Sequence, residues 1–129
     1  MAIQFLKRLG FENFEHQSDT CRHDLECDKD GEHYYIEVKY REHYKSTDFN
    51  DTILQLDKYE ALKDLKNVYI INIFTDNIIT FINIKEPHKI IKRRCKHTSW
   101  WGGKRELKDL VSYDNKGRRY HLYPQSAAH

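Results

Sequence analysis

Residues 24–39, DLECDKDGEHYYIEVK, decide how the chain folds, and they predict two short strands joined by a tight turn. Asp30-Gly31 is a two-residue hairpin signal, because glycine accepts the positive φ that such turns need. A turn at these residues fixes the register of the whole hairpin. The predicted facing pairs are Lys29 with Glu32, Cys27 with Tyr34, Leu25 with Ile36, and Asp24 with Glu37.

The hairpin has two faces, because successive side chains of a strand point to opposite sides. The apolar face is predicted to carry Leu25, Cys27, Tyr34, Ile36, Val38 and Tyr40. The polar face is predicted to carry Asp24, Glu26, Tyr35, Glu37 and Lys39. Two carboxylates directly across a ladder repel each other, but a divalent cation between them takes both as oxygen ligands. At this point a solvent-facing polar strand with scattered charges is an equal alternative.

The composition indicates one globular domain. The chain has 129 residues, 39% of them hydrophobic, and three cysteines at no disulfide-scaffold spacing. No apolar run approaches the roughly 18 residues that span a bilayer, and the first residues lack the layout of a signal peptide. We therefore expect a reduced, intracellular (cytoplasmic) protein without a membrane partner.

Charge is divided unevenly along the chain. Residues 1–84 carry ten basic against sixteen acidic side chains, a net charge of −6. Residues 85–129 carry twelve basic against four acidic side chains, a net charge of +8. This asymmetry favours an acidic site beside a basic surface that binds a polyanion such as nucleic acid, although a basic tail can also be merely solvated.

Periodicity and turn signals predict the other elements, in the order helix, hairpin, strand, helix, strand, strand. The strand after the central helix is expected to return parallel to its predecessor. Helices are predicted at 3–9, from 51 or 52 to about 66, and at 104–111, with a short helix or a loop at 88–96. Strands are predicted at 11–16, 68–74 and 78–84, loops at 41–50 and 98–103, and a turn between short strands at 115–117.

Three short motifs occur in an order that carries a resemblance. They are Asp24, Glu37-Val38-Lys39, and Gln55-x-x-x-Tyr59. Their placement on strand, strand and helix resembles the PD-(D/E)xK nuclease superfamily, with a RecB-like Gln-x-x-x-Tyr motif, in a small phage-type or resolvase-like member. The resemblance implies an α/β, restriction-endonuclease-like fold: a mixed β-sheet flanked by helices in a single domain over 1–129. Its core would cover about 3–84, with a basic C-terminal extension over about 85–129.

The same resemblance implies hydrolysis of DNA phosphodiester bonds with Mg²⁺ or Mn²⁺, by an endonuclease more than an exonuclease. Asp24 and Glu37 would hold the metal, together with the backbone carbonyl of Val38. Lys39 would orient the attacking water and stabilise charge at the phosphate, and Gln55 and Tyr59 would support the site from the helix. Enzymes of this fold that cut both strands often form homodimers, which leaves a homodimer open here.

The chain departs from the family pattern at two positions. His23 stands where the motif has proline. The N-terminal helix offers Gln4 where many relatives have an acidic residue. Either this branch lacks that acid, or Glu26 or Asp19 replaces it.

Basic residues of the C-terminal part are the predicted DNA contacts, because cations neutralise phosphates. They are Lys92, Arg93, Arg94, Lys96, Lys104 and Arg105. Trp100 and Trp101 could stack on bases or belong to the core. Two rival functions stay open at this point: a non-catalytic nucleic-acid-binding module on the same fold, and an interaction protein whose acidic half docks a basic partner.

Overall fold

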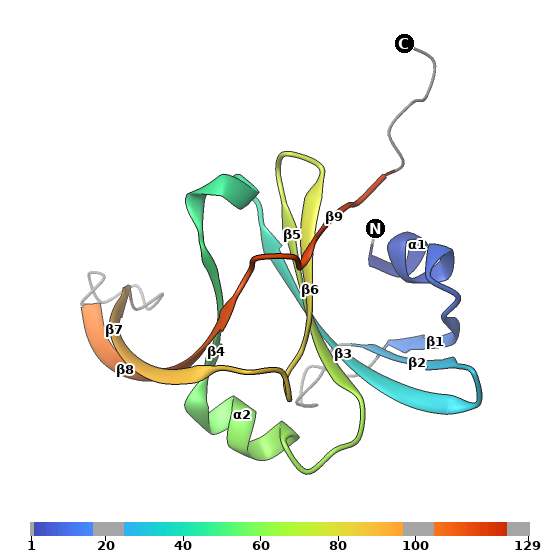
Figure 1. Ribbon diagram of the computed structural model, residues 1–129, viewed down its shortest axis with the longest axis horizontal. Coiled ribbons are helices and arrows are strands. Elements are labelled where there is room, and N and C mark those ends of the chain that lie inside the picture. Colours follow the sequence, from blue (N-terminus) through green and yellow to red (C-terminus); the bar gives the residue numbers. More distant parts are fainter. Residues whose placement is uncertain (1, 17–24, 97–104, 124–129) are drawn as a thin grey trace.

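The computed structural model describes residues 2–16, 25–96 and 105–123. Within these ranges the chain forms a main sheet, with strand order β1-β2-β3-β5-β6-β9, and a small sheet, with order β4-β8-β7 (Figure 1). The main sheet consists of β1 (Glu12–His16), β2 (Leu25–Lys29), β3 (Glu32–Arg41), β5 (Val68–Phe74), β6 (Ile78–Asn83) and β9 (Arg119–His121). The small sheet consists of β4 (Asp51–Gln55), β8 (Arg105–Asp114) and β7 (Lys89–Lys96). The helices are α1 (Ala2–Arg8), α2 (Leu56–Leu62) and the 3₁₀ turn η1 (Ser46–Asp48).

The β2–β3 hairpin has the predicted register. Its strands pair Lys29 with Glu32 and Leu25 with Ile36. Asp30 and Gly31 both have positive φ, 53° and 78°, as a two-residue turn of this twist requires. The prediction that Asp24 faces Glu37 concerns a residue outside the described ranges.

Strands β3 and β5 form the parallel centre of the main sheet. Their register runs from Tyr35 opposite Val68 to Arg41 opposite Phe74. The connection between them contains η1, β4 and α2, so the predicted parallel return is confirmed. β5 is buried at every position except Tyr69, which is half-buried, as expected of a strand covered on both faces.

Each face of the main sheet has its own hydrophobic core. On the first face α1 packs Phe5 and Leu6 against the hairpin and β5. The predicted apolar side of the hairpin lies here: Cys27 is fully buried, and this burial, with Asp28 nearby, raises the pKa of its thiol to about 12. Tyr40, at the far end of that row, is exposed. On the second face the core is made of Leu54, Leu62, Val68, Ile70, Ile82, Ile84, Val111 and Tyr113.

The helix predicted from residue 51 or 52 to 66 is wrong at its beginning. Residues 51–55 form β4, and α2 covers only 56–62. Thr52 and Leu54 are buried while their neighbours point outward, which is the period of a strand. β4 gains its partner from β8, far away in sequence, so the strand is stabilised by a contact that local spacing does not reveal.

Two further predictions in the basic part of the chain are wrong. The segment 88–96, expected as a helix or loop, contains β7, and the helix expected at 104–111 is replaced by β8. The two strands pair along their length, from Lys89 opposite Ser112 to Lys96 opposite Arg105. Leu107 and Leu110 are spaced as in a helix, but antiparallel pairing overrides that weak preference.

The end of the chain returns to the main sheet. β9 pairs antiparallel with β6, after a turn at Asn115–Gly117 in which Gly117 has a φ of 75°. The predicted turn between strands is therefore confirmed. In the described residues no helix is long and apolar enough to cross a membrane.

Candidate active site

Glu37 is a buried carboxylate on the second face of the main sheet. Its side chain is 1% exposed. Lys39 lies with its Nζ 3.1 Å from Oε1 of Glu37, and the ammonium group of Lys58 donates a hydrogen bond to the same oxygen. Among the described residues the other oxygen, Oε2, has no hydrogen-bond partner. A buried acceptor without a partner costs free energy, unless a group from outside completes it.

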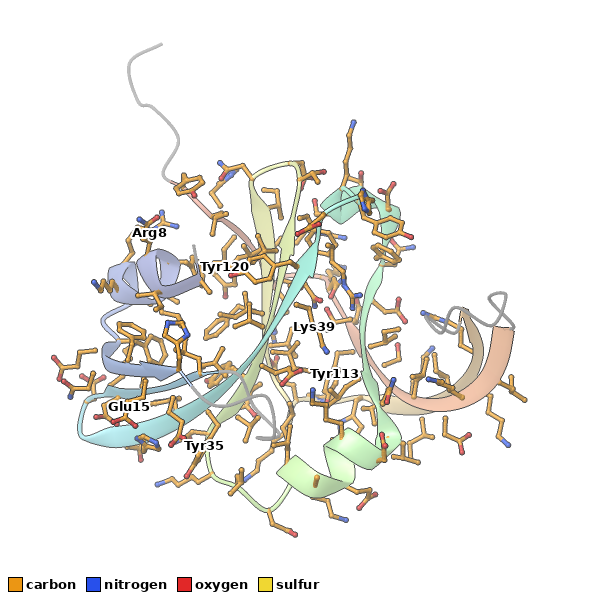
Figure 2. The ribbon with its side chains drawn as sticks, turned by 180° about the vertical axis from the view of Figure 1, so that it is seen from behind. Arg8, Glu15, Tyr35, Lys39, Tyr113 and Tyr120 are labelled. Carbon is orange, nitrogen blue, oxygen red and sulfur yellow. The ribbon has the colours of Figure 1, made fainter. Side chains whose placement is uncertain are left out.

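Two of the predicted site residues, Glu37 and Lys39, are thus brought together by strand alternation alone. Figure 2 shows Lys39 in the region between β3 and β4. Lys39 is 40% exposed at its side chain while Glu37 is covered. The pair therefore presents an ammonium group to solvent above a buried carboxylate.

Lys58 is a member of the site that the sequence reasoning missed. It lies on α2, one turn before the fully buried Leu62. Residues four apart share a helix face, so Lys58 lies on the same side of α2 as Leu62, toward the sheet. The sequence interpretation used this helix only for the Gln-x-x-x-Tyr motif and gave Lys58 no role.

Gln55 and Tyr59 do not reach Glu37 in the described part of the chain. Gln55 is the exposed residue at the junction of β4 and α2, where it borders a surface hollow with Lys108 and Asp109. Tyr59 packs beside the second core, and its ring centre lies 5.0 Å from that of His88. The helical spacing assumed for this pair is absent because Gln55 has extended backbone angles.

The predicted metal ligands are only partly covered by the structure. Asp24 lies outside the described residues, and Val38 contributes a strand backbone opposite Ile71. Within the described ranges no three His, Cys, Asp or Glu side chains are grouped so as to hold a metal ion. The orphaned Oε2 of Glu37 nevertheless fits a cation, because carboxylate oxygens are the ligands that hard divalent ions prefer.

A buried polar cluster continues the second face beyond Lys39. The Asn72 amide donates to the hydroxyl oxygens of Thr52, at 3.3 Å, and Thr80, at 3.2 Å. The Thr52 hydroxyl in turn donates to Oδ1 of Asn115, at 2.5 Å. These residues come from both sheets, so the cluster fixes β4 against β5 and β6 next to the Glu37 site.

The predicted DNA contacts lie on β7 and β8 or outside the described part. Lys92 is exposed, with its Nζ 3.8 Å from Asp109. Arg93 donates to Asp51 at 2.9 Å. Burial of Asp51 would raise its pKa, but hydrogen bonds from Arg93 and Ser112 outweigh that effect and lower the pKa. Outside the described set fall the side chains of Arg94, Lys96 and Arg105, and the residues Lys104, Trp100 and Trp101.

An open cleft lies beside these basic residues. It has a volume of about 790 Å³ and is bordered by η1 and both outer strands of the small sheet. His88, Lys89 and Arg93 line one part of it, and Asp48 and Asp51 line another. The cleft is therefore lined by both signs of charge.

The sheet order, the parallel β3–β5 centre and the position of Glu37 and Lys39 on β3 define a mixed α/β domain with a restriction-endonuclease-like fold. A solved structure has this fold: Hjc, a Holliday junction resolvase from Archaeoglobus fulgidus. The match covers 93% of this chain and 91% of that one, with a TM-score of 0.53 and 14% sequence identity. No protein-family model and no curated protein matches the sequence.

Proposed function

We propose that the protein is a metal-dependent nuclease that hydrolyses DNA phosphodiester bonds, with the site of the PD-(D/E)xK superfamily. The observation that carries this proposal is the buried Glu37 carboxylate, with Lys39 on one oxygen and no partner for the other among the described residues. A side chain so placed is poor for stability. It suits a site that a cation and a phosphate complete.

Mg²⁺ or Mn²⁺, held by Glu37 and Asp24 and by the Val38 carbonyl, would supply a polarised phosphoryl oxygen and a bound water of lowered pKa. The hairpin register supports this assignment, because Leu25, which follows Asp24 in the sequence, pairs with Ile36, which precedes Glu37. Lys39 would position the attacking water and place positive charge where the phosphate becomes most negative. Gln55 and Tyr59 remain supporting residues only if the helix turns toward the site on binding.

The substrate class rests on charge and on the structural neighbour. Hjc is a Holliday junction resolvase, which favours endonuclease action on branched DNA here. The resemblance of the motifs adds a homodimer to the proposal. Lys92 and Arg93 on β7, with Arg94, Lys96, Lys104 and Arg105 nearby in sequence, would contact the phosphate backbone. We place such an enzyme inside the cell, where DNA is found, and a phage origin would suit its small size.

Cleavage assays test this proposal. The protein is incubated with four-way-junction, duplex and single-stranded DNA in Mg²⁺, Mn²⁺ or EDTA, and the products are separated on gels. We expect metal-dependent cleavage that falls by at least about a thousandfold in Glu37→Ala and Lys39→Ala. Lys63→Ala, an exposed lysine paired with Glu60, is the matched control and should cut as wild type. Cleavage by Glu37→Ala at the wild-type rate would overturn the proposal.

One observation favours a second function, a non-catalytic nucleic-acid-binding module. Lys58 already contacts Oε1 of Glu37 beside Lys39, so two ammonium groups balance the charge of the carboxylate without a divalent ion. This alternative predicts salt-sensitive DNA binding that is the same in EDTA and in Mn²⁺, with no cleavage of any substrate.

A further inference from the structure

Arg41 is the last residue of a charged row on β3. It follows Glu37 and Lys39 at two-residue intervals, so all three point to the second face of the main sheet. Within the described residues no carboxylate lies within salt-bridge distance of its guanidinium, and its Nε donates to Oδ1 of Asn72 at 3.2 Å. Partial burial lowers the pKa of Arg41.

Asn72 holds the guanidinium in one orientation. Its amide nitrogen is already bound to Thr52 and Thr80 in the buried polar cluster, so its oxygen is fixed toward Arg41. With Nε engaged, the two terminal nitrogens of Arg41 are left to point elsewhere. A planar guanidinium with two such nitrogens fits the paired oxygens of a phosphate.

Arg41 borders a small pocket between the two sheets. The pocket has a volume of about 60 Å³, several times the roughly 10–15 Å³ that one water molecule needs, so it has room for a compact oxyanion. Phe49 and Phe74 form part of its wall. The pocket is smaller than the roughly 300–1,000 Å³ pockets that take whole small molecules, so its size suits a group such as phosphate.

The charges around the pocket leave an excess of one positive unit. Arg41 and Arg93 line it with Asp51, and Asp51 is already paired with Arg93. A phosphodiester carries one negative charge and would balance this excess. A dianion would meet the Asp51 carboxylate with one charge uncompensated, so the pocket suits a diester better than a terminal phosphate.

We propose that Arg41 and its pocket bind a phosphodiester of the DNA backbone, next to the phosphate that is cut at Glu37 and Lys39. Alternate residues of a strand lie about 6.6 Å apart. Phosphates of one DNA strand rise about 3.4 Å each along the helix axis, and their separation through space is larger because the strand winds around that axis. Lys39 and Arg41 are therefore close enough together to contact neighbouring phosphates of one strand. The position relative to the cut rests on the proposed nuclease function, whereas the phosphate contact itself does not.

Fluorescence anisotropy with a labelled four-way junction tests the contact. Binding is measured in EDTA, so that no metal or cleavage is involved, at several salt concentrations. We expect Arg41→Gln to raise the Kd about tenfold and to reduce the slope of log K against log salt by about one. Arg118→Gln removes the same charge from a guanidinium already paired with Glu86, and it should leave both values unchanged.

A second measurement does not depend on a stable variant. The Nε–H signal of Arg41 in the wild-type protein is followed by NMR while a short duplex is added in EDTA. We expect it to shift, and the Arg118 signal to stay in place. An unmoved Arg41 signal in saturated protein, or an Arg41→Gln variant that is folded and binds like wild type, would overturn the proposal. Junction binding through Arg41 without cleavage would instead sink the nuclease proposal alone.

Discussion

The two faces of the main sheet share the same strands but bury different chemistry. On the first face, Ile36 and Cys27 pack against α1, and the core is apolar. On the second face, one residue further along β3, Glu37 is buried as deeply as Ile36. α2 and the small sheet cover this face (Figure 1). The first face shows the apolar burial that stabilises β3. On the second face β3 buries a charged side chain, which stability alone does not explain.

The strongest test of this contrast is a truncation on the first face. Leu6→Ala should lower the free energy of unfolding by about 2–5 kcal/mol, because Leu6 is fully buried and leaves a cavity. Ile90→Ala removes an exposed aliphatic side chain and should change stability by less than about 0.5 kcal/mol. Urea unfolding measures both. Equal effects would show that α1 is not part of the core.

The buried polar cluster on the second face should matter somewhat less. Thr52→Val keeps the shape of the side chain but removes the hydroxyl shared with Asn72 and Asn115. We expect a loss of about 1–3 kcal/mol in the free energy of unfolding. Thr75→Val, at an exposed turn position, is the control and should stay close to wild type. A neutral Thr52→Val would mean that the cluster does not join the sheets.

A substitution of Lys58 tests whether Glu37 is a metal ligand. If the lysine acts as a counter-ion in the metal-free state, Lys58→Met should tighten Mn²⁺ binding by about fivefold, about 1 kcal/mol, because a positive charge is removed from the site. Lys63→Met, on the exposed end of the same helix, should leave the affinity unchanged. Weaker Mn²⁺ binding in Lys58→Met would contradict this role and would make the lysine part of the loaded site.

Charges on the same polar face of the hairpin, but outside the cover of α2, should have the smallest effect. The His33 ring contacts Glu26 at 2.5 Å and Asp28 at 2.6 Å, and hydrogen bonds to these carboxylates raise its pKa. The resulting stabilisation is present below the unfolded-state pKa of about 6.5 and is lost as the pH rises through the higher folded-state pKa. Solvent screening limits it to a few tenths of a kcal/mol.

Urea unfolding at pH 5.5 and 8.5 checks this sign. The free energy of unfolding of wild type should exceed that of His33→Gln at pH 5.5, and this difference should disappear at pH 8.5. The control His43→Gln, at an exposed loop position, should differ from wild type by the same amount at both pH values. A wild-type advantage that grows with pH would contradict the assignment of the His33 contacts.

Sequence reasoning succeeded where local signals and burial agree. Asp30-Gly31 determines the hairpin register, and the continuous apolar run of β5 indicates a strand covered on both sides. From these two features the Glu37–Lys39 pair could be placed on one face before any coordinates were known. The restriction-endonuclease-like fold followed from the order of the motifs.

The same reasoning failed where long-range pairing decides the structure. β4 and β7 are strands because β8 lies between them, and neither the spacing of the leucines nor that of the basic residues along the chain reveals that partner. The error at β4 also gave Gln55 and Tyr59 a shared helix face that the structure does not have, and Lys58 between them was given no role. Arg41 was missed for another reason: its role depends on Asn72 and on the pocket between the sheets, which no local pattern indicates.

The central claim is that the buried Glu37 carboxylate is a metal ligand. Isothermal titration calorimetry of Mn²⁺ binding tests it most directly, with wild type, Glu37→Gln and, as a control, Glu60→Gln. We predict one site in wild type and in Glu60→Gln, and no measurable binding in Glu37→Gln, with all three proteins folded by circular dichroism. Wild-type protein that takes up no Mn²⁺, or Glu37→Gln that binds it equally well, would contradict the claim.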